Sequence, residues 1–353
     1  MESQIMNHRR LEEILNCFPG LRIAVVGDFF LDKWLEIDRS LDEPSLETGL
    51  TAYQVVAKRC YAGAAGTVLS NLAALEIGKL YAIGFLGDDG EAFEMIRALR
   101  GLGVDTGRLA TSSDVMTPTY TKPVFRRASG LEESNRLDHK NIRPTPLDLE
   151  QKIIDSIWEI APDVDAVIAL DQLTDEGYGV LTPRVREELA RLGNQNPGLV
   201  LYADSRAYIS RFHNMIIKCN NIEALKLFSS PDDGDIEKKA SSPDEVKKCL
   251  LKLAGMSNRP VFITCGSRGV MAPGKDGPVL VPGVSLPPGT PIDIVGAGDA
   301  CSSGIVTTLC AGGTPAEAAF VGNLVAANTI QVVGTTGTAT RSQVLGLFDR
   351  YFA

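Results

Sequence analysis

The sequence contains no long hydrophobic run and few of the residues that bind metals. No apolar run approaches the ~18 residues that a membrane-spanning helix needs, so a membrane partner is not expected. Only three histidines are present, and none of the seven cysteines forms a C-x-x-C pair, so neither a zinc site nor a disulfide framework is predicted. A formal net charge of −9 argues against binding to nucleic acid. Reduced thiols are typical of the cytoplasm, where we expect the protein to be located.

A dinucleotide-binding fingerprint is also absent after the first apolar segment, residues 21–26. That segment is followed by Gly27-Asp28-Phe29-Phe30 instead of G-x-G-x-x-G, which argues against a Rossmann dehydrogenase. From residue 150 onward, short apolar segments alternate with helical ones. Strands are predicted at 166–170, 200–203, 215–217 and 261–264, and helices at 147–160, 183–193, 221–229, 243–255, 299–312, 314–332 and 341–352. This alternation predicts an α/β fold with a doubly wound, mainly parallel sheet flanked by helices.

Two stretches before residue 150 have a different character. Residues 33–60 and 112–140 are polar and lack a helical period, although 119–125 has strand character. We interpret both as one small β lid inserted into a larger body, so that residues 1–353 form a single domain. An exposed lid of this kind is also a candidate surface for a homodimer.

The most informative segment is D-I-V-G-A-G-D at 293–299, which precedes a helix rich in small residues. Gly296 and Gly298 allow the backbone to approach a ligand closely, because neither carries a Cβ. The N–H groups of 296–299 would face outward from a helix N-terminus, which stabilises negative charge such as a phosphoryl group in transfer. Asp299 is a candidate general base for a hydroxyl group. The same residues also fit a tight turn capped by an aspartate.

Three further segments follow predicted strands or helices. The pair Asn220 and Glu223 fits a helix capping box, and the glycine-rich residues 264–270 fit a hairpin turn. Residues 334–338 fit a loop. No segment indicates a function alone, but all of them fall in loops at the expected ligand side of one sheet.

Taken together, these segments resemble the ribokinase-like (PfkB) carbohydrate kinases over nearly the whole chain. The family's D-x-x-G-A-G-D pattern matches 293–299. The resemblance implies an ATP-dependent carbohydrate kinase that uses ATP and Mg²⁺, with K⁺ as a further candidate ligand. Three segments look like the heptose 7-phosphate kinase branch: 25–32, Arg136-Leu137-Asp138 and Gly337-Thr338.

The resemblance also implies roles for individual residues. Asp299 would be the base, with Gly296, Ala297 and Gly298 as the anion hole. The implied nucleotide-side residues are Asn220, Glu223, Thr264, Gly266, Gly269, Asn323 and Asn328. Glu223 would hold Mg²⁺ through water, and Asp293 would hold a monovalent cation. The implied sugar-side residues are Asp28, Asp32, Gly63, Thr67, Arg136 and Arg206.

The sequence departs from the family pattern where the sugar is expected. Thr67 replaces an asparagine, Val295 replaces a threonine, and Asp204-Ser205-Arg206-Ala207 replaces D-P-K-G. A phosphorylated acceptor would need cations from Lys122, Arg126, Arg127, Arg136 or Arg206, and we expect Arg206 to be the first of these. A nucleoside kinase of the same fold and a non-catalytic relative that binds nucleotide or sugar both stay open as alternatives.

Overall fold

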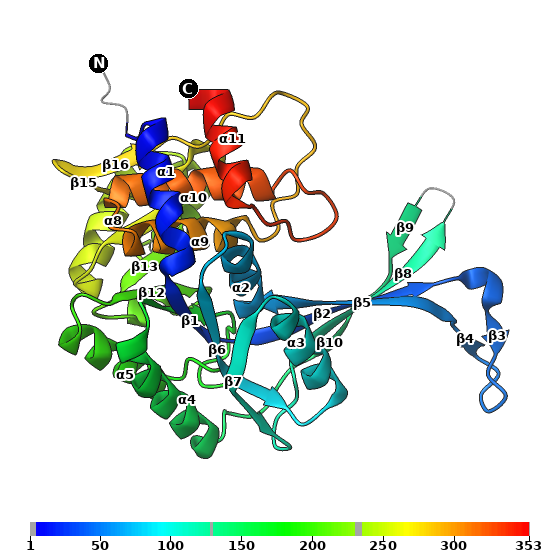
Figure 1. The fold of residues 1–353 in the computed structure, drawn as a ribbon. Helices are drawn as coiled ribbons and strands as arrows, with labels where there is room; N and C mark the ends of the chain where they lie inside the picture. Colours follow the sequence, from blue (N-terminus) through cyan, green and yellow to red (C-terminus); the bar gives the residue numbers. More distant parts are fainter. Residues whose placement is uncertain (1–4, 128–129, 230–234, 353) are drawn as a thin grey trace.

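A nine-stranded sheet forms the centre of the protein (Figure 1). The computed structural model describes residues 5–127, 130–229 and 235–352. The strand order is β16-β15-β14-β13-β12-β11-β1-β6-β7, and all neighbours are parallel except that β15 is antiparallel to β14 and β16. The strands are β1 (Arg22–Gly27), β6 (Lys79–Gly87), β7 (Val104–Ser112), β11 (Ala166–Asp171), β12 (Val200–Ser205), β13 (Ile216–Asn220), β14 (Val261–Thr264), β15 (Val270–Gly274) and β16 (Gly277–Val281).

Helices cover both faces of this sheet, as the continuous burial of β1 requires. Ile23 and Val25 point into one hydrophobic core, and the alternate residues Ala24 and Val26 point into the other. The first core is closed by α1 (His8–Cys17), α2 (Ala65–Ala74), α3 (Gly90–Gly101), α9 (Ala297–Cys310), α10 (Pro315–Thr329) and α11 (Arg341–Phe352). The second is closed by α4 (Leu147–Ile160), α5 (Pro183–Gln195), α6 (Asn221–Lys226), α7 (Ile236–Ala240) and α8 (Pro243–Ser257).

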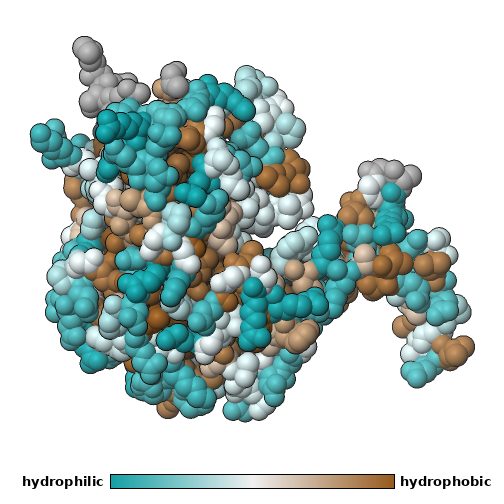
Figure 2. All heavy atoms as spheres, viewed as in Figure 1, coloured by the Kyte–Doolittle hydropathy of each residue, from teal (hydrophilic) through white to brown (hydrophobic). Residues whose placement is uncertain are grey.

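A second, smaller sheet projects from the body (Figure 1). Its order is β10-β8-β2-β5, with β9 paired to β8. The strands are β2 (Phe29–Ile37), β5 (Val55–Ala64), β8 (Thr119–Arg127), β9 (Gly130–Glu133) and β10 (Leu137–His139), and a two-stranded extension pairs β3 (Glu43–Pro44) with β4 (Thr51–Ala52). Figure 2 shows apolar side chains exposed on this projection, where Leu46 is fully exposed and Leu50 is 72% exposed.

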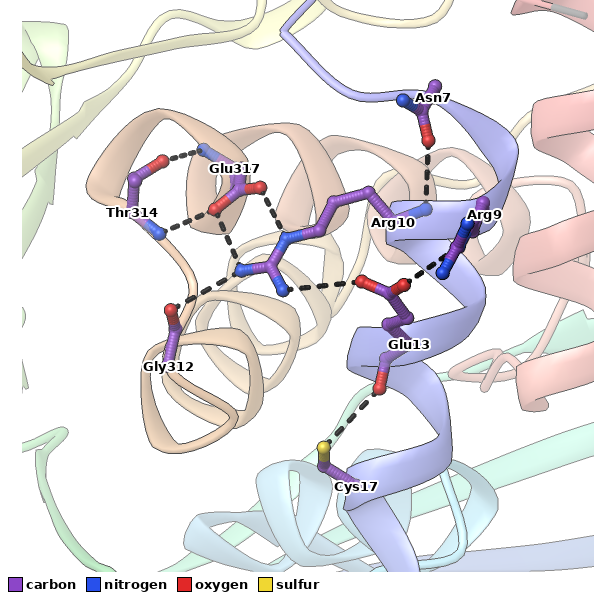
Figure 3. A network of polar contacts seen from close by, with 8 residues as sticks. All are labelled: Asn7, Arg9, Arg10, Glu13, Cys17, Gly312, Thr314 and Glu317. Atoms are coloured by element: carbon purple, nitrogen blue, oxygen red, sulfur yellow. Dashed lines mark hydrogen bonds and ion pairs between the residues drawn. The ribbon is translucent and has the colours of Figure 1, made fainter.

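Arg10 is one of the residues that fasten the N-terminal helix to the body (Figure 3). The Arg10 Nε donates to Glu317 Oε1 at 2.8 Å, and its Nη2 donates to the carbonyl of Gly312 at 3.4 Å. Glu317 also caps α10, because its Oε2 accepts from the N–H of Thr314. Burial opposes ionisation of Glu317, but the Arg10 guanidinium outweighs it and lowers the pKa of that carboxyl.

The predicted α/β fold with a doubly wound, mainly parallel sheet is confirmed. Several elements differ from the sequence prediction in extent. Residues 33–60, interpreted from the sequence as part of a small β lid, contribute most of two long strands, Phe29–Ile37 and Val55–Ala64. Cross-strand pairing stabilises this polar ribbon. Strands β7, β15 and β16 and the short α7 were not predicted. None of the described helices is long and apolar enough to cross a membrane.

Candidate active site

The first turn of α9 presents unpaired backbone donors at the carboxyl edge of the sheet. Gly296 precedes the helix with φ of +79°, and a Cβ there would lie 2.6 Å from Cγ2 of Thr336. Ala300 N donates to the carbonyl of Gly296 at 3.0 Å, which closes the turn. Among the described residues, no protein acceptor takes a hydrogen bond from the N–H of Gly298 or of Asp299. Such free donors at a helix N-terminus form a site for an anionic group.

Asp299 lies in the same turn, and its side chain is half-buried. Burial raises the pKa of this carboxyl to about 7, and the neighbouring carboxylate of Asp204 adds to the effect. The cations Lys218 and Arg206 act in the opposite direction. A carboxyl group with this pKa can exchange a proton with a hydroxyl near neutral pH.

An ion pair lies directly beneath this turn. Asp204 on β12 and Lys218 on β13 are register partners, and their Oδ2 and Nζ atoms are 2.5 Å apart. Ser302 Oγ donates to Asp204 Oδ2 at 3.3 Å and accepts from the hydroxyl of Tyr202 at 3.0 Å. Burial alone would lower the pKa of Lys218, but the carboxylate of Asp204 outweighs it and raises that pKa. Lys218 is therefore charged although its side chain is buried.

The loop after β13 contains the predicted capping box. Asn220 Oδ1 accepts from Glu223 N, and Glu223 Oε2 accepts from Asn220 N, both at 2.8 Å. Burial, assisted by Asp204, raises the pKa of Glu223. Among the described residues, no three histidine, cysteine, aspartate or glutamate side chains form a cluster that could enclose a metal ion. The Glu223 carboxyl at this edge fits Mg²⁺, which proteins often hold through one or two carboxylates, water and substrate phosphates.

The predicted nucleotide-side residues lie along the next strands of the same edge. Thr264 pairs with Asn220 in the β13–β14 register. Gly266 has φ of +60° and Gly269 has φ of +101°, and a Cβ at Gly269 would overlap the carbonyl oxygen of Val281. This loop therefore needs glycine for its backbone shape, independently of any ligand.

The two predicted asparagines of α10 are engaged with the protein itself. Asn323 Nδ2 donates to the carbonyl groups of Val281 and Pro282 at 3.1 and 3.0 Å, and Asn328 Nδ2 donates to the carbonyl of Leu324 at 2.9 Å. Asn323 thus ties α10 to the end of β16. The structure gives both side chains a structural contact, and a nucleotide contact stays a prediction.

A cavity of about 260 Å³ lies between the small sheet and the body. Its lining residues are Asp32, Trp34, Tyr61, Ala62, Thr67, Ser70, Lys122, Glu133, Asp293, Val295, Gly334, Thr335 and Thr336. Three of the predicted site residues, Asp32, Thr67 and Asp293, are therefore brought together here. Gly63 lies behind Asp32, since a Cβ on Gly63 would be 2.5 Å from Oδ2 of that aspartate.

Other predicted sugar-side residues lie outside this lining. The buried carboxylate of Asp28 accepts from the N–H groups of Gln172 and Val180 at 3.0 and 2.8 Å, so it fastens a loop of the body. Arg136 is paired with Asp138 through two hydrogen bonds. Arg206 is exposed, and among the described residues its guanidinium has no ion-pair partner.

The aromatic lining was not predicted from the sequence. Trp34 lies two residues after Asp32 on β2, and alternate residues of a strand share one face. That alternation was the available signal for Trp34. Tyr61 lies on the neighbouring strand, where it is the register partner of Asp32.

Asp293 joins two loops at the wall of the cavity. Its Oδ1 accepts from Val295 N at 3.1 Å, and its Oδ2 accepts from Gly334 N at 3.2 Å. The carboxylate therefore fixes the loop before α9 against the loop after α10.

The comparison with protein families gives one match in the part of the chain that contains this site. Residues 186–341 match the pfkB family carbohydrate kinase model. These residues include the ion pair, the capping box and the whole first turn of α9.

Curated relatives are similar over almost the whole chain. Bifunctional protein HldE from Citrifermentans bemidjiense is 26% identical over 341 residues, which cover 96% of this chain and 66% of the relative. Bifunctional protein HldE from Desulfatibacillum aliphaticivorans is 29% identical over 334 residues, which cover 93% of this chain and 63% of the relative. The chain thus spans slightly less than two thirds of the length of these relatives.

Among solved structures, Arabidopsis thaliana ribokinase complexed with ribose and ATP has a TM-score of 0.64 at 18% identity, covering 93% of this chain and 98% of that one. At this identity the similarity shows a shared ribokinase-like fold.

Proposed function

We propose that this chain, whose residues 186–341 match the pfkB family carbohydrate kinase model, transfers the γ-phosphoryl group of ATP to a hydroxyl group of a sugar. The observation that carries the proposal is the first turn of α9. There the N–H groups of Gly298 and Asp299 have no acceptor among the described residues, and the pKa of the Asp299 carboxyl is about 7. Phosphoryl transfer needs a positioned base and donors for the transferred charge, and this turn offers both.

In the proposed reaction, Asp299 accepts the proton of the attacking sugar hydroxyl. The sugar oxygen forms a bond to the γ-phosphorus, and the bond from that phosphorus to the oxygen of the leaving ADP breaks. The N–H groups of Gly298 and Asp299 stabilise the charge on the phosphoryl oxygens, because donors at a helix N-terminus need no reorientation during the step. The N–H of Ala297 is not among these donors, because it donates to the carbonyl of Ile294 at 3.2 Å. The small sheet lies over the acceptor cavity, where closure of a lid would exclude water.

In the proposed reaction, cations would bind at two positions. Mg²⁺ would neutralise phosphate charge, with Glu223 holding it through water. This assignment is supported by the half-buried Glu223 carboxyl, which forms part of the capping box at the edge of the sheet. Asp293 and the loop that begins at Gly334 are the residues we propose for K⁺. Their support is the convergence of a carboxylate and loop backbone at one wall of the cavity.

The acceptor is proposed to lie against Asp32 and Trp34 in the cavity. A carboxylate can accept hydrogen bonds from sugar hydroxyls, and the indole offers an apolar surface for the sugar ring. The resemblance to heptose kinases makes a heptose 7-phosphate one candidate. Arg206 is then the cation we propose for its phosphate, because it is exposed and has no ion-pair partner among the described residues.

An uncharged sugar is a second candidate, and the charge of the cavity favours it. The described lining contains three carboxylates, Asp32, Glu133 and Asp293, but a single ammonium, that of Lys122. Lys122 is already paired with Asp32 at 3.4 Å. A phosphate placed among these carboxylates would be repelled unless Arg206 turned toward it.

A homodimer through the small sheet is also proposed. Leu46, Leu50 and Leu131 are all at least half exposed on the projecting strands and their connections. Exposed apolar side chains grouped on one projection favour contact with another protein surface, and a second copy offers a matching one. Sedimentation velocity of wild type and Leu46→Ser/Leu50→Ser would test it. A dimer that the double substitution dissociates supports the proposal, and a monomeric wild type at about 50 μM contradicts it.

The experiment that tests the activity is ADP release from ATP and Mg²⁺ with a panel of acceptors. The panel contains neutral sugars, sugar phosphates including a heptose 7-phosphate, and nucleosides, each with and without K⁺. Stimulation by a sugar supports the proposal, and the best acceptor identifies its class. Stimulation by nucleosides alone favours a nucleoside kinase. If ATP binds and no acceptor stimulates ADP release, the non-catalytic alternative is favoured.

A further inference from the structure

Lys218 is a cation buried in the middle of the large sheet. It is 5% exposed and lies on β13 between two parallel neighbours. Moving an ammonium group out of water is costly unless a carboxylate and further acceptors compensate. Asp204 Oδ2 at 2.5 Å and the carbonyl oxygen of Gly298 at 3.3 Å are those acceptors.

The ion pair touches α9 at two points, one helical turn apart. Lys218 donates to Gly298 O, and Asp204 accepts from Ser302 Oγ. Tyr202, which is fully buried, donates in turn to Ser302 Oγ. Both members of the pair therefore fasten the start of α9 to the carboxyl edge of β12 and β13. A Cβ on Gly298 would lie 3.2 Å from Lys218 Nζ, so the glycine leaves room for this contact.

A core that only needed stability would not require these charges. Replacing a buried ion pair by apolar residues of similar volume is often neutral or stabilising. This pair lies under the turn that contains Asp299, and its two charges act on that carboxyl in opposite directions. Its position therefore indicates a role in the chemistry of the turn.

Given the phosphoryl transfer proposed above, we propose that Lys218 is a positioning residue whose ammonium, held by Asp204, fixes the first turn of α9 so that the N–H groups of Gly298 and Asp299 face the transferred phosphoryl group. Lys218 also provides, together with Arg206, a positive charge that lowers the pKa of the Asp299 carboxyl. The other charged groups that act on Asp299 are Asp204 from β12 and Arg206 from the residue after it. Removal of the Lys218 ammonium therefore disorders the anion hole and raises the pKa of the base.

The first test needs no substrate. Carbon-13 NMR of the Asp299 carboxyl, assigned by its loss in Asp299→Asn, reports its titration in the ligand-free protein. Lys218→Met should move the midpoint to higher pH, and Asp204→Asn should move it to lower pH. The two shifts in opposite directions follow from the signs of the removed charges. A structural role alone would produce no such pair of shifts.

The second test is steady-state kinetics on the same variants. Lys218→Met should lower kcat about tenfold or more at pH 7, while KM for ATP and acceptor changes about twofold or less. Arg10→Met is the matched control, because it also removes a cation from a carboxylate but lies near Gly312, beyond the far end of α9. The control should leave both kcat and the Asp299 titration unchanged.

If Lys218→Met does not fold, the double variant Lys218→Met/Asp204→Asn replaces it in the test. The double variant removes both charges of the pair, so no unpaired charge stays buried in the sheet. A folded double variant with the kcat of the wild type would overturn the proposal. So would Lys218→Met with an unshifted Asp299 midpoint. If wild type shows no turnover with any acceptor, the proposed function fails, but the titration still decides whether Lys218 acts on Asp299.

Discussion

The ammonium of Lys122 lies 3.4 Å from Asp32 Oδ1 and 5.0 Å from the centre of the Trp34 ring, at the wall of the cavity between the two sheets. The side chains come from adjacent strands, β8 and β2, in parallel register. The ion pair and the cation–π contact together hold the indole at the cavity wall. An acceptor bound as proposed would therefore meet an aromatic surface whose orientation is set before it binds.

Trp34→Ala should raise KM for the acceptor about tenfold and leave KM for ATP unchanged, because an apolar contact with the sugar ring is lost. The other tryptophan, Trp158, is the matched control, since it lies on α4 and donates to Glu188. Trp158→Phe should have wild-type kinetics and leave Trp34 as the single reporter. Acceptor binding to Trp158→Phe should then change the fluorescence of Trp34. Unchanged acceptor KM in Trp34→Ala would place the sugar elsewhere.

Activity should depend on pH through Asp299. The base must be ionised to accept a proton, and burial raises its pKa to about 7. We expect kcat/KM for the acceptor to fall as pH drops from about 8 to about 6 and to become proportional to hydroxide concentration below that. A profile that stays flat to about pH 5 would contradict the assignment of this carboxyl as the base.

Gly269→Ala should destabilise the protein by about 2 kcal/mol or more, because φ is +101° and a Cβ would overlap the carbonyl of Val281. Gly266→Ala is the comparison: φ is +60° there as well, but no atom lies within 4 Å of the added carbon. Its cost should be about 1 kcal/mol, from the backbone conformation alone. Urea unfolding measures both, and equal costs would show that the loop moves freely away from Val281.

Arg10→Ala should lower the free energy of unfolding by about 1 kcal/mol, because it releases α1 from Glu317 and Gly312 (Figure 3). Arg9→Ala is the control: Arg9 pairs with Glu13, but its side chain is 90% exposed. The control should change stability by less than about 0.3 kcal/mol. Both variants should keep wild-type kcat, and a loss of activity in Arg10→Ala would indicate coupling along α9 and α10.

Much of the fold follows from local sequence signals. The apolar run at 21–26 predicts a strand buried on both faces, and its alternate residues enter the two cores. The strands β15 and β16 were missed, because Val270–Gly274 and Gly277–Val281 contain prolines and glycines that resemble a loop. Their pairing comes from tertiary contacts with α10 and β14.

The site was partly predictable for a similar reason. Asp299 and the glycines before it form one contiguous motif, so the sequence alone places them close together. Lys218 carried no such signal, because its partner Asp204 is distant along the chain and meets it only through the β12–β13 register. The contacts of Asp28 were equally unpredictable from the sequence, since its carboxylate accepts hydrogen bonds from the N–H groups of Gln172 and Val180, which are far along the chain. Residues 128–129 of the predicted lid stretch lie outside the described residues.

The most direct test of the account compares Asp299→Asn with wild type in acceptor-stimulated ADP release at pH 8. Asparagine keeps the size of the side chain but cannot accept the proton, so kcat should fall by about 10²-fold or more while ATP still binds. The variant should be no less stable than wild type at this pH, because burial disfavours the ionised carboxylate that it replaces. Wild-type kcat in a folded Asp299→Asn protein would contradict the claim that Asp299 is the base.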